Sequence, residues 1–387
     1  MKIIKKISIL CVISLVFALN LVIFNKNPIN SVQAMANLSS SAKAMCVLEK
    51  DSKRVIFSKN MEEKLPMAST TKVVTAITVL QHCNDLEQYI TVDDSAIGIE
   101  GTSIYLRSGE LVKIKDLLYG LMLRSGNDAA VALACHVGGS VEGFTKLMEE
   151  LAVKIGATSS SFANPHGLDN KEHYTTAHDL ALITAYALNN PIFKQIVSTK
   201  RYVIEATNKS DKRYLTNKNK LLSTLDGCCG VKTGFTSKAG RCLVSAVEKE
   251  NSTYVCVVLN CGPMFEESAT LLNSVSCNYK NTQIIDKSKE VYNEYILDNN
   301  AGKLYLYAEE DFYYPLSDEE MKDIKLEYIV TLDNAGVGDV VGEIKIFFKK
   351  DLIKSVKLVT MNKIDKLFED NKLNLNEVLW EENLNEN

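Results

Sequence analysis

Three consecutive apolar segments between residues 230 and 260 constrain the fold of this chain most strongly. They read G-V-K-T-G-F-T (230–236), R-C-L-V-S-A-V-E (241–248) and T-Y-V-C-V-V-L-N (253–260). Since only four residues separate each segment from the next, the pattern predicts consecutive antiparallel strands joined by short turns. An earlier stretch, residues 44–60, has the pattern of a two-strand hairpin. We expect the early and the late strands to form one sheet.

Helix-like segments occupy the chain between these two sets of strands. Apolar residues at helical spacing predict helices over about 69–82, 114–137, 141–155 and 177–188, with one more near 266–275. R-S-G-N at residues 124–127 interrupts the second of them, because glycine disfavours a helix interior. A helical cluster between two sets of strands predicts an α/β domain, an antiparallel sheet with packed helices, over residues 37–282.

The chain changes character after about residue 283. Short strand-like segments such as I-K-L-E-Y-I-V-T-L (324–332) follow one another without a long helix, which predicts a small all-β domain over residues 283–363. The last segment, residues 364–387, has apolar residues at the spacing of an amphipathic helix. It carries seven acidic and two basic residues, a balance that weakens attraction to an anionic membrane.

The first 36 residues have the pattern of a secretory signal peptide. Three lysines precede an apolar run over residues 7–24, and small residues suited to cleavage follow at Ala34 and Ala36. The run also reaches membrane-spanning length, so an uncleaved anchor is the alternative. In either case we expect the remaining chain to be extracytoplasmic, secreted or at the outer face of the cytoplasmic membrane.

Charge and cysteine content narrow the possible partners and cofactors. A net charge of −4 gives no indication of nucleic-acid binding. Nine cysteines lie beyond residue 36, an odd number without a C-x-x-C pair, so we expect buried thiols rather than disulfides or a zinc site. His166, His173, His178 and Asp179 are not at zinc-binding spacings, so we interpret them as loop and helix-cap residues. We therefore expect neither a cofactor nor a metal.

Ser69 and Lys72 form an S-x-x-K pattern at the start of the first predicted helix. Residues three apart on a helix are neighbours, so Lys72 could remove the proton of a nucleophilic Ser69 if burial lowers the lysine pKa. The alternative is a capping serine followed by a lysine whose ammonium group reaches solvent. The pattern alone decides nothing, because it also occurs at Ser40 and Lys43.

Two further patterns stand in settings that suit a catalytic cleft. Ser125 and Asn127 form an S-x-N pattern at the break between two apolar helices, from which both side chains could point into a cleft. Lys232, Thr233 and Gly234 form the one K-T-G of the chain, on a predicted strand. There a glycine allows close approach of a substrate, and the lysine and threonine could hold a carboxylate.

S-x-x-K, S-x-N and K-T-G in this order mark β-lactamases and penicillin-binding proteins. With L-P-M-A-S-T-T-K, L-M-L-R-S-G-N-D-A-A, N-P-H-G-L-D and V-K-T-G-F-T-S-K-A-G-R, the chain resembles the low-molecular-mass penicillin-binding proteins that are serine-type D-Ala-D-Ala carboxypeptidases of peptidase family S11. The resemblance covers residues 43–275 strongly and residues 283–363 more loosely. It implies a β-lactamase/transpeptidase-like catalytic domain followed by a β domain.

The resemblance also implies a mechanism and a set of site residues. Ser69 would attack the bond between two D-alanines of a peptidoglycan stem pentapeptide and form an acyl-enzyme, with Lys72 as general base. The leaving amine would receive its proton through Lys72, Ser125 and Asn127. The substrate carboxylate would bind Lys232 and Thr233 beside Gly234, and the backbone N–H groups of Ser69 and Phe235 would form the oxyanion hole. β-Lactam antibiotics would acylate Ser69 as inhibitors.

Two departures from the family pattern and two alternative functions stay open. After the strand that follows K-T-G, N-C-G-P-M-F-E-E-S lacks the arginine that some members use for the carboxylate, and Arg241 is near only in sequence. The acidic tail also differs from a basic membrane-binding helix, so peripheral association with membrane or cell wall is left open. A β-lactamase would need a loop glutamate to activate water, and Glu172 stands in a different sequence context. A non-catalytic penicillin-binding or cell-wall-binding protein is the other alternative.

Overall fold

A computed structural model describes residues 40–297, 300–331, 336–361 and 377–383 of the chain. The predicted signal peptide, residues 1–36, lies outside the described residues. Within the described ranges, no helix has both the length and the apolar character required to cross a membrane.

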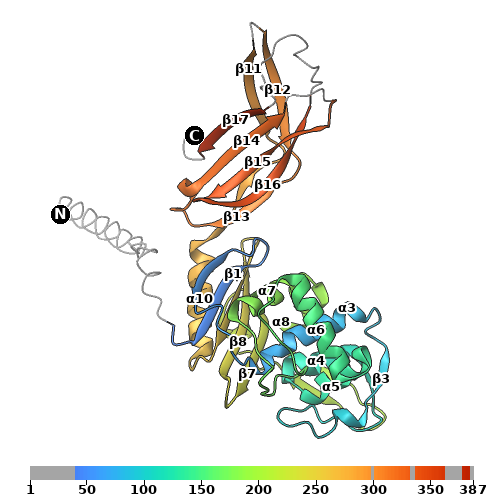
Figure 1. The fold of residues 1–387 in the computed structure, drawn as a ribbon. Helices are drawn as coiled ribbons and strands as arrows, with labels where there is room; N and C mark the ends of the chain where they lie inside the picture. Colours follow the sequence, from blue (N-terminus) through green and yellow to red (C-terminus); the bar gives the residue numbers. More distant parts are fainter. Residues whose placement is uncertain (1–39, 298–299, 332–335, 362–376, 384–387) are drawn as a thin grey trace, which may run out of the picture. The chain divides into compact units, whose positions relative to one another are not determined.

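The larger domain is built on a five-stranded antiparallel sheet (Figure 1). Its strands are β1 (Ala44–Glu49), β2 (Val55–Lys59), β7 (Cys228–Thr236), β8 (Gly240–Lys249) and β9 (Ser252–Leu259), in the order β2-β1-β9-β8-β7. β1 pairs with β9, so the early and late strands share one sheet, as predicted. β7 pairs with β8 alone among the described strands and is therefore an edge strand.

The helices of this domain confirm most of the predicted ranges. Ser140 caps one helix through a bond from the Gly143 N–H, and Gly156 ends it in the left-handed conformation with φ of 90°. Thr176 caps the next helix through the Asp179 N–H. The helices are η1 (Ala68–Thr71), α3 (Lys72–His82), η2 (Asp94–Ala96), α4 (Ile114–Tyr119), η3 (Gly120–Arg124, a π-helical turn), α5 (Asn127–Gly138), α6 (Val141–Ile155), α7 (Ala177–Ala187), α8 (Pro191–Ser198), α9 (Leu221–Thr224) and α10 (Met264–Asn278).

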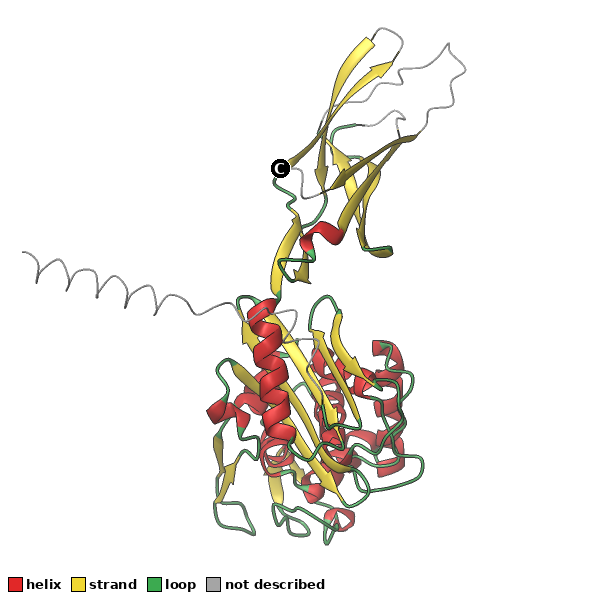
Figure 2. Ribbon diagram, turned by 90° about the vertical axis from the view of Figure 1, so that its left-hand side faces the viewer, coloured by secondary structure: helices red, strands yellow, loops and turns green. Residues whose placement is uncertain are grey.

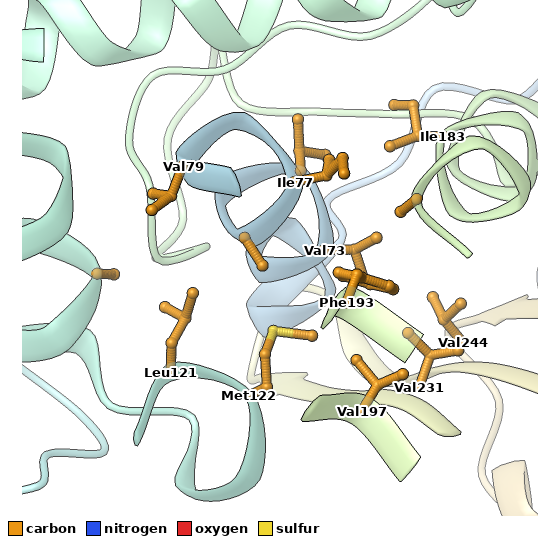
Figure 3. Packing of buried hydrophobic residues seen from close by; sticks show 14 of the residues in the cluster. Val73, Ile77, Val79, Leu121, Met122, Ile183, Phe193, Val197, Val231 and Val244 are labelled. Carbon is orange, nitrogen blue, oxygen red and sulfur yellow. The ribbon is translucent and has the colours of Figure 1, made fainter. Parts of the chain in front are cut away.

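α3 is the central helix of the cluster. All residues from Lys72 to Val79 are buried, as expected for a helix surrounded by other elements. Figure 3 shows Val73, Ile77 and Val79 of this helix among side chains of η3, α7, α8, β7 and β8. α10 runs along the sheet and packs on β8 and β9 (Figure 2). Two two-stranded antiparallel sheets complete the domain: β3 (Tyr89–Thr91) with β4 (Leu111–Lys113), and β5 (Arg201–Ile204) with β6 (Arg213–Thr216).

The remaining described residues form strands with a core of their own, as the predicted all-β character requires. One sheet has the order β10-β13, and the other has the order β11-β12-β16-β15-β14-β17. The elements are β10 (Lys280–Ile285), β11 (Glu290–Leu297), β12 (Asn300–Ala308), β13 (Phe312–Leu316), η4 (Met321–Asp323), β14 (Ile324–Thr331), β15 (Val340–Phe348), β16 (Asp351–Thr360) and β17 (Glu377–Asn383).

The predicted amphipathic helix over residues 364–387 is wrong for Glu377–Asn383, which form strand β17. β17 pairs with β14 from Thr331 opposite Glu377 to Lys325 opposite Asn383. Without it β14 would leave a row of backbone groups unpaired at the sheet edge, and this pairing outweighs a local helical pattern. The other residues of the predicted helix lie outside the described ranges.

Candidate active site

Ser69 and Lys72 meet at the junction of two helices. Ser69 lies in the 3-10 turn η1, and Lys72 is the first residue of α3. The Lys72 side chain is buried, and its Nζ lies 2.9 Å from Ser69 Oγ. The same Nζ donates to Asn127 Oδ1 at 2.7 Å and to the His166 carbonyl at 2.5 Å. The lysine is therefore held against the serine by two further contacts.

Burial lowers the pKa of the Lys72 amine well below its ordinary value of 10.5. The nearby charges of Lys232 and Lys218 lower this pKa further, while Asp128 opposes them. Two positive neighbours and the loss of hydration both favour the neutral amine. A neutral amine beside a hydroxyl can accept its proton, so the environment prepares Lys72 for general-base chemistry.

Ser125 and Asn127 stand where the π-helical turn η3 gives way to α5. Ser125 has a left-handed backbone with φ of 65°, which turns the chain sharply before the next helix begins. The Asn127 amide is oriented because its Nδ2 donates to the Glu100 carbonyl at 2.5 Å, leaving Oδ1 for Lys72. Ser125 is buried, with 4% of its surface exposed. The structure thus brings Asn127 to Lys72.

β7 carries Lys232, Thr233, Gly234 and Phe235 along its unpaired edge. Lys232 is buried, its Nζ donates to the Thr233 carbonyl at 2.8 Å, and burial together with Lys218 lowers its pKa to about 7. Thr233 is half-buried and the Phe235 side chain is exposed. Across the β7–β8 ladder from Phe235 lies Arg241, whose Nη1 donates to the Gly262 carbonyl at 3.2 Å.

Gly234 explains why this strand can lie against the Ser69 turn. A Cβ at Gly234 would lie 3.0 Å from the Ser69 amide nitrogen and 3.1 Å from the Met67 carbonyl oxygen. These distances are at the limit of ordinary contact, so only a glycine fits without displacing the turn. The S-x-x-K and K-T-G patterns, distant in sequence, therefore form one site.

The loop from residue 163 to 175 contributes contacts that the sequence patterns did not identify. His166 supplies a carbonyl to Lys72, and Thr75 Oγ1 donates to the Pro165 carbonyl at 2.6 Å. His173 Nε2 lies 2.8 Å from Thr71 Oγ1. The prediction that these histidines are loop residues is confirmed, but it missed their contacts with Thr71 of η1 and Lys72 of α3. A carbonyl contact leaves no signal in residue type, so the sequence could not have revealed it.

Asp128 is a second residue that the patterns missed. Its carboxylate accepts from the Ile104 and Leu106 amides at 3.1 and 3.0 Å, and from the Ser103 hydroxyl at 2.6 Å. These charge-assisted bonds shape the loop that begins at Thr102. The Asn127 N–H donates to the Thr102 carbonyl at 2.7 Å, which fixes the start of α5. Asp128 therefore supports the position of Asn127 from behind the site.

Two histidines of the 163–175 loop, the buried His173 and the partly buried His166, make the folded chain sensitive to acid. Burial, with the charge of Lys72, lowers the pKa of His166 to about 3 and that of His173 to about 4, from an ordinary 6.5. As the pH falls below 6.5, these histidines bind protons in the unfolded chain but stay neutral in the folded chain. Their contribution to the free energy of unfolding is therefore complete above pH 6.5 and declines below it. Each histidine contributes a slope of up to about 1.4 kcal/mol per pH unit.

We therefore expect the free energy of unfolding, measured in urea, to fall between about pH 7 and 5.5. This window lies above the range in which ordinary carboxyl groups titrate. His173→Gln should reduce the slope, while His136→Gln, which removes an exposed histidine, should leave it unchanged. An unfolding free energy that is constant across the window would contradict the prediction.

Within the described ranges, no three His, Cys, Asp or Glu side chains gather in a way that could hold a metal ion. The nine cysteines of the described chain, from Cys46 to Cys277, are free thiols. The reactive groups that the structure brings together at the site are the Ser69 hydroxyl, the Lys72 amine and the Asn127 amide, with Gly234 of β7 against the Ser69 turn.

Comparisons with known proteins match both parts of the chain. The family model of D-alanyl-D-alanine carboxypeptidase matches residues 30–262, and that of the penicillin-binding protein 5 C-terminal domain matches residues 279–366. D-alanyl-D-alanine carboxypeptidase DacF of Bacillus subtilis (strain 168) is 33% identical over 239 residues, which are 60% of this chain and 61% of that protein.

Two solved structures are similar over most of the chain. Penicillin binding protein 5 from Haemophilus influenzae has a TM-score of 0.69 at 27% identity, covering 84% of this chain and 98% of that one. D-alanyl-D-alanine carboxypeptidase DacD from Francisella tularensis has a TM-score of 0.69 at 25% identity, covering 85% of this chain and 94% of that one.

Proposed function

Because this chain belongs to the D-alanyl-D-alanine carboxypeptidase family, we propose that it removes the terminal D-alanine from peptidoglycan stem pentapeptides through an acyl-enzyme on Ser69. The observation that carries the proposal is the buried Lys72 amine, 2.9 Å from Ser69 Oγ. A serine hydroxyl is a weak nucleophile until a base takes its proton, and no other basic side chain is bonded to Ser69 in the described structure.

In the acylation step, neutral Lys72 takes the Ser69 proton while Oγ attacks the carbonyl carbon between the two D-alanines. The developing oxyanion accepts hydrogen bonds from the backbone N–H groups of Ser69 and Phe235. The close approach of Gly234 to the Ser69 turn supports this pairing of donors. Preorganised donors of this kind are worth roughly 3–4 kcal/mol each in related acyl transfers.

The tetrahedral intermediate then collapses and the C–N bond breaks. Protonated Lys72 returns its proton to the leaving D-alanine amine, with Ser125 and Asn127 beside it. Water attacks the acyl-enzyme in the second step and releases the shortened peptide. Lys232 and Thr233 hold the carboxylate of the terminal D-alanine. The Lys232 amine suits this role. Burial lowers its pKa to about 7, and a bound carboxylate would stabilise its charged form.

One observation favours this function over that of a β-lactamase. The loop around residues 164–173 supplies Lys72 with a backbone carbonyl, from His166, and its Glu172 side chain is exposed. Rapid deacylation of penicillin by a class A β-lactamase requires a glutamate that activates water. The loop therefore supports a long-lived penicillin adduct, as in a penicillin-binding protein.

We further propose a cellular location for the enzyme and a role for its second domain. The pattern of residues 1–36 supports export, which would bring the site to the peptidoglycan outside the cytoplasmic membrane. We assign residues 37–282 to catalysis and residues 283–363 to a β domain that serves as a spacer or as a platform for partners. The pairing of β17 with β14 extends that β domain into the last segment of the chain.

The test is the intact mass of the full-length chain, followed over time after mixing with benzylpenicillin, together with D-alanine release from a pentapeptide. We expect a long-lived adduct of one drug, absent in Ser69→Ala and retained in Ser40→Ala, which alters the other S-x-x-K pattern. An adduct that disappears within seconds while penicillin is consumed would favour a β-lactamase. The absence of any adduct and of D-alanine release would favour a non-catalytic binding protein.

A further inference from the structure

A buried chain of hydrogen bonds leads from the 163–175 loop to the residue before Ser69. The Ala163 N–H donates to His173 Nδ1 at 3.1 Å, and His173 Nε2 lies 2.8 Å from Thr71 Oγ1. Thr71 Oγ1 in turn lies 2.8 Å from the Ala68 carbonyl oxygen. His173 and Thr71 are 3% and 0% exposed, so water does not compete for these bonds.

The direction of each bond follows from the groups at its two ends. A backbone N–H can only donate, so Nδ1 of His173 accepts and the ring proton of the neutral imidazole is on Nε2. Nε2–H therefore donates to Thr71 Oγ1. A carbonyl oxygen can only accept, so the Thr71 hydroxyl donates to Ala68. All three hydrogen bonds therefore run in the same direction, each donated from the loop side toward the turn that carries Ser69.

Ala68, at the end of this chain, has a conformation that alanine disfavours. Its φ of +49° is in the left-handed region, which is unfavourable for a residue with a Cβ because the Cβ crowds the carbonyl oxygen. Ala68 directly precedes Ser69, so its backbone angles determine where the Ser69 N–H and Oγ point. A strained conformation persists only where surrounding contacts hold it.

We infer that His173 is a positioning residue, which holds the Ser69 turn in its reactive conformation through the hydroxyl of Thr71. The inference rests on the proposed role of Ser69 as nucleophile. The same loop also bonds Lys72 through the His166 carbonyl. One loop thus orients the nucleophile turn at one end and the base at the other, and a small displacement of the turn would separate Ser69 from Lys72.

The first experiment removes the central hydroxyl. Thr71→Val has a similar shape but cannot donate to Ala68, whereas Thr71→Ser keeps the donor. Thr78→Val is a matched control, because Thr78 is equally buried on α3 and its hydroxyl donates to the Val74 carbonyl of the same helix. We expect Thr71→Val to reduce the second-order rate of acylation by benzylpenicillin roughly 10- to 100-fold, a size typical of a nucleophile displaced by about 1 Å. Thr71→Ser and Thr78→Val should be acylated at close to the wild-type rate. Thr71→Val and Thr78→Val should have matching melting temperatures.

The second experiment separates the two ends of the imidazole. Glutamine at position 173 can place an amide N–H where Nε2 lies, while asparagine can replace Nδ1 but is too short to reach Thr71. We expect His173→Gln to recover most of the acylation rate that His173→Asn loses, although both remove the ring.

The outcomes distinguish this inference from the proposed function. If the wild-type chain forms no adduct on Ser69, the proposed function fails. If the wild type acylates and Thr71→Val acylates as fast as Thr78→Val, only the positioning role is overturned. Equal rates for His173→Gln and His173→Asn would likewise overturn the direction assigned to the chain.

Discussion

Replacing Lys72 by methionine is expected to lower the rate of acylation by benzylpenicillin by about 10³-fold, within the range that general acid–base groups contribute. Methionine has a similar length but no amine, so nothing would take the Ser69 proton. The turn that carries Ser69 would remain, because its bonds from Thr70 and Thr71 do not involve Lys72. Residual reaction would come from the backbone donors and from binding alone.

The same substitution is expected to leave the melting temperature at or above that of the wild type. The pKa of Lys72 is lowered in the folded chain, so below its ordinary pKa of 10.5 the unfolded chain holds this proton more tightly. The lysine therefore makes folding less favourable at neutral pH, and methionine removes that cost. Loss of activity without loss of stability is the signature of a group retained for chemistry.

The measurement is the acylation rate by intact mass, with the melting temperature of the same samples. Lys154→Met, which alters an exposed lysine on α6, is the control and should change neither quantity. A Lys72→Met variant that acylates at the wild-type rate would exclude Lys72 as the general base. A large fall in melting temperature would contradict the stability argument.

Replacing Gly167 by alanine is expected to destabilise the chain by at least about 3 kcal/mol, at the high end for a single substitution. Gly167 has a left-handed backbone with φ of +93°, and a Cβ there would lie 1.9 Å from the Ala68 carbonyl oxygen. That oxygen is the acceptor of the Thr71 hydroxyl, so the loop or the η1 turn must move. We expect both the unfolding free energy and the acylation rate to fall.

Gly156→Ala separates the clash from the backbone strain. Gly156 has nearly the same φ, +90°, but no atom lies within 4 Å of its would-be Cβ. The substitution should cost only the roughly 1–2 kcal/mol of a left-handed alanine and leave acylation unchanged. Urea unfolding of the two variants measures the difference. Equal costs would show that the loop yields without disturbing the turn.

The periodicity of the sequence was sufficient for most of the fold. Apolar alternation and short turns predicted β7, β8 and β9, and apolar residues at helical spacing predicted helices such as α6 and α7, because these signals act over a few residues. β17 was predicted wrongly, since its strand conformation depends on pairing with the distant edge of β14. Local spacing cannot anticipate a partner that lies about 50 residues away in the chain.

At the site, too, local sequence signals predicted some features, while contacts between distant segments were not predicted. Ser69, Lys72, Ser125, Asn127, Lys232, Thr233 and Gly234 were predicted as site residues from their type, order and setting, because the proposed chemistry requires hydroxyls, amines, an amide and a close backbone approach. The bond from Lys72 to the His166 carbonyl and the bond between Thr71 and His173 were not identified. A carbonyl belongs to every residue, and a histidine in a loop has many uses, so neither contact has a signal in the sequence.

The sequence by itself thus determined which groups are available for the reaction and the order of the strands and helices that carry them. Only the tertiary structure decided that Lys72 is buried beside Lys232 and Lys218, which lowers its pKa. It alone placed Gly167 against Ala68 and bonded His173 to Thr71. The physical reason is that hydration, charge and strain depend on what packs around a residue, and those neighbours come from segments far apart in the chain.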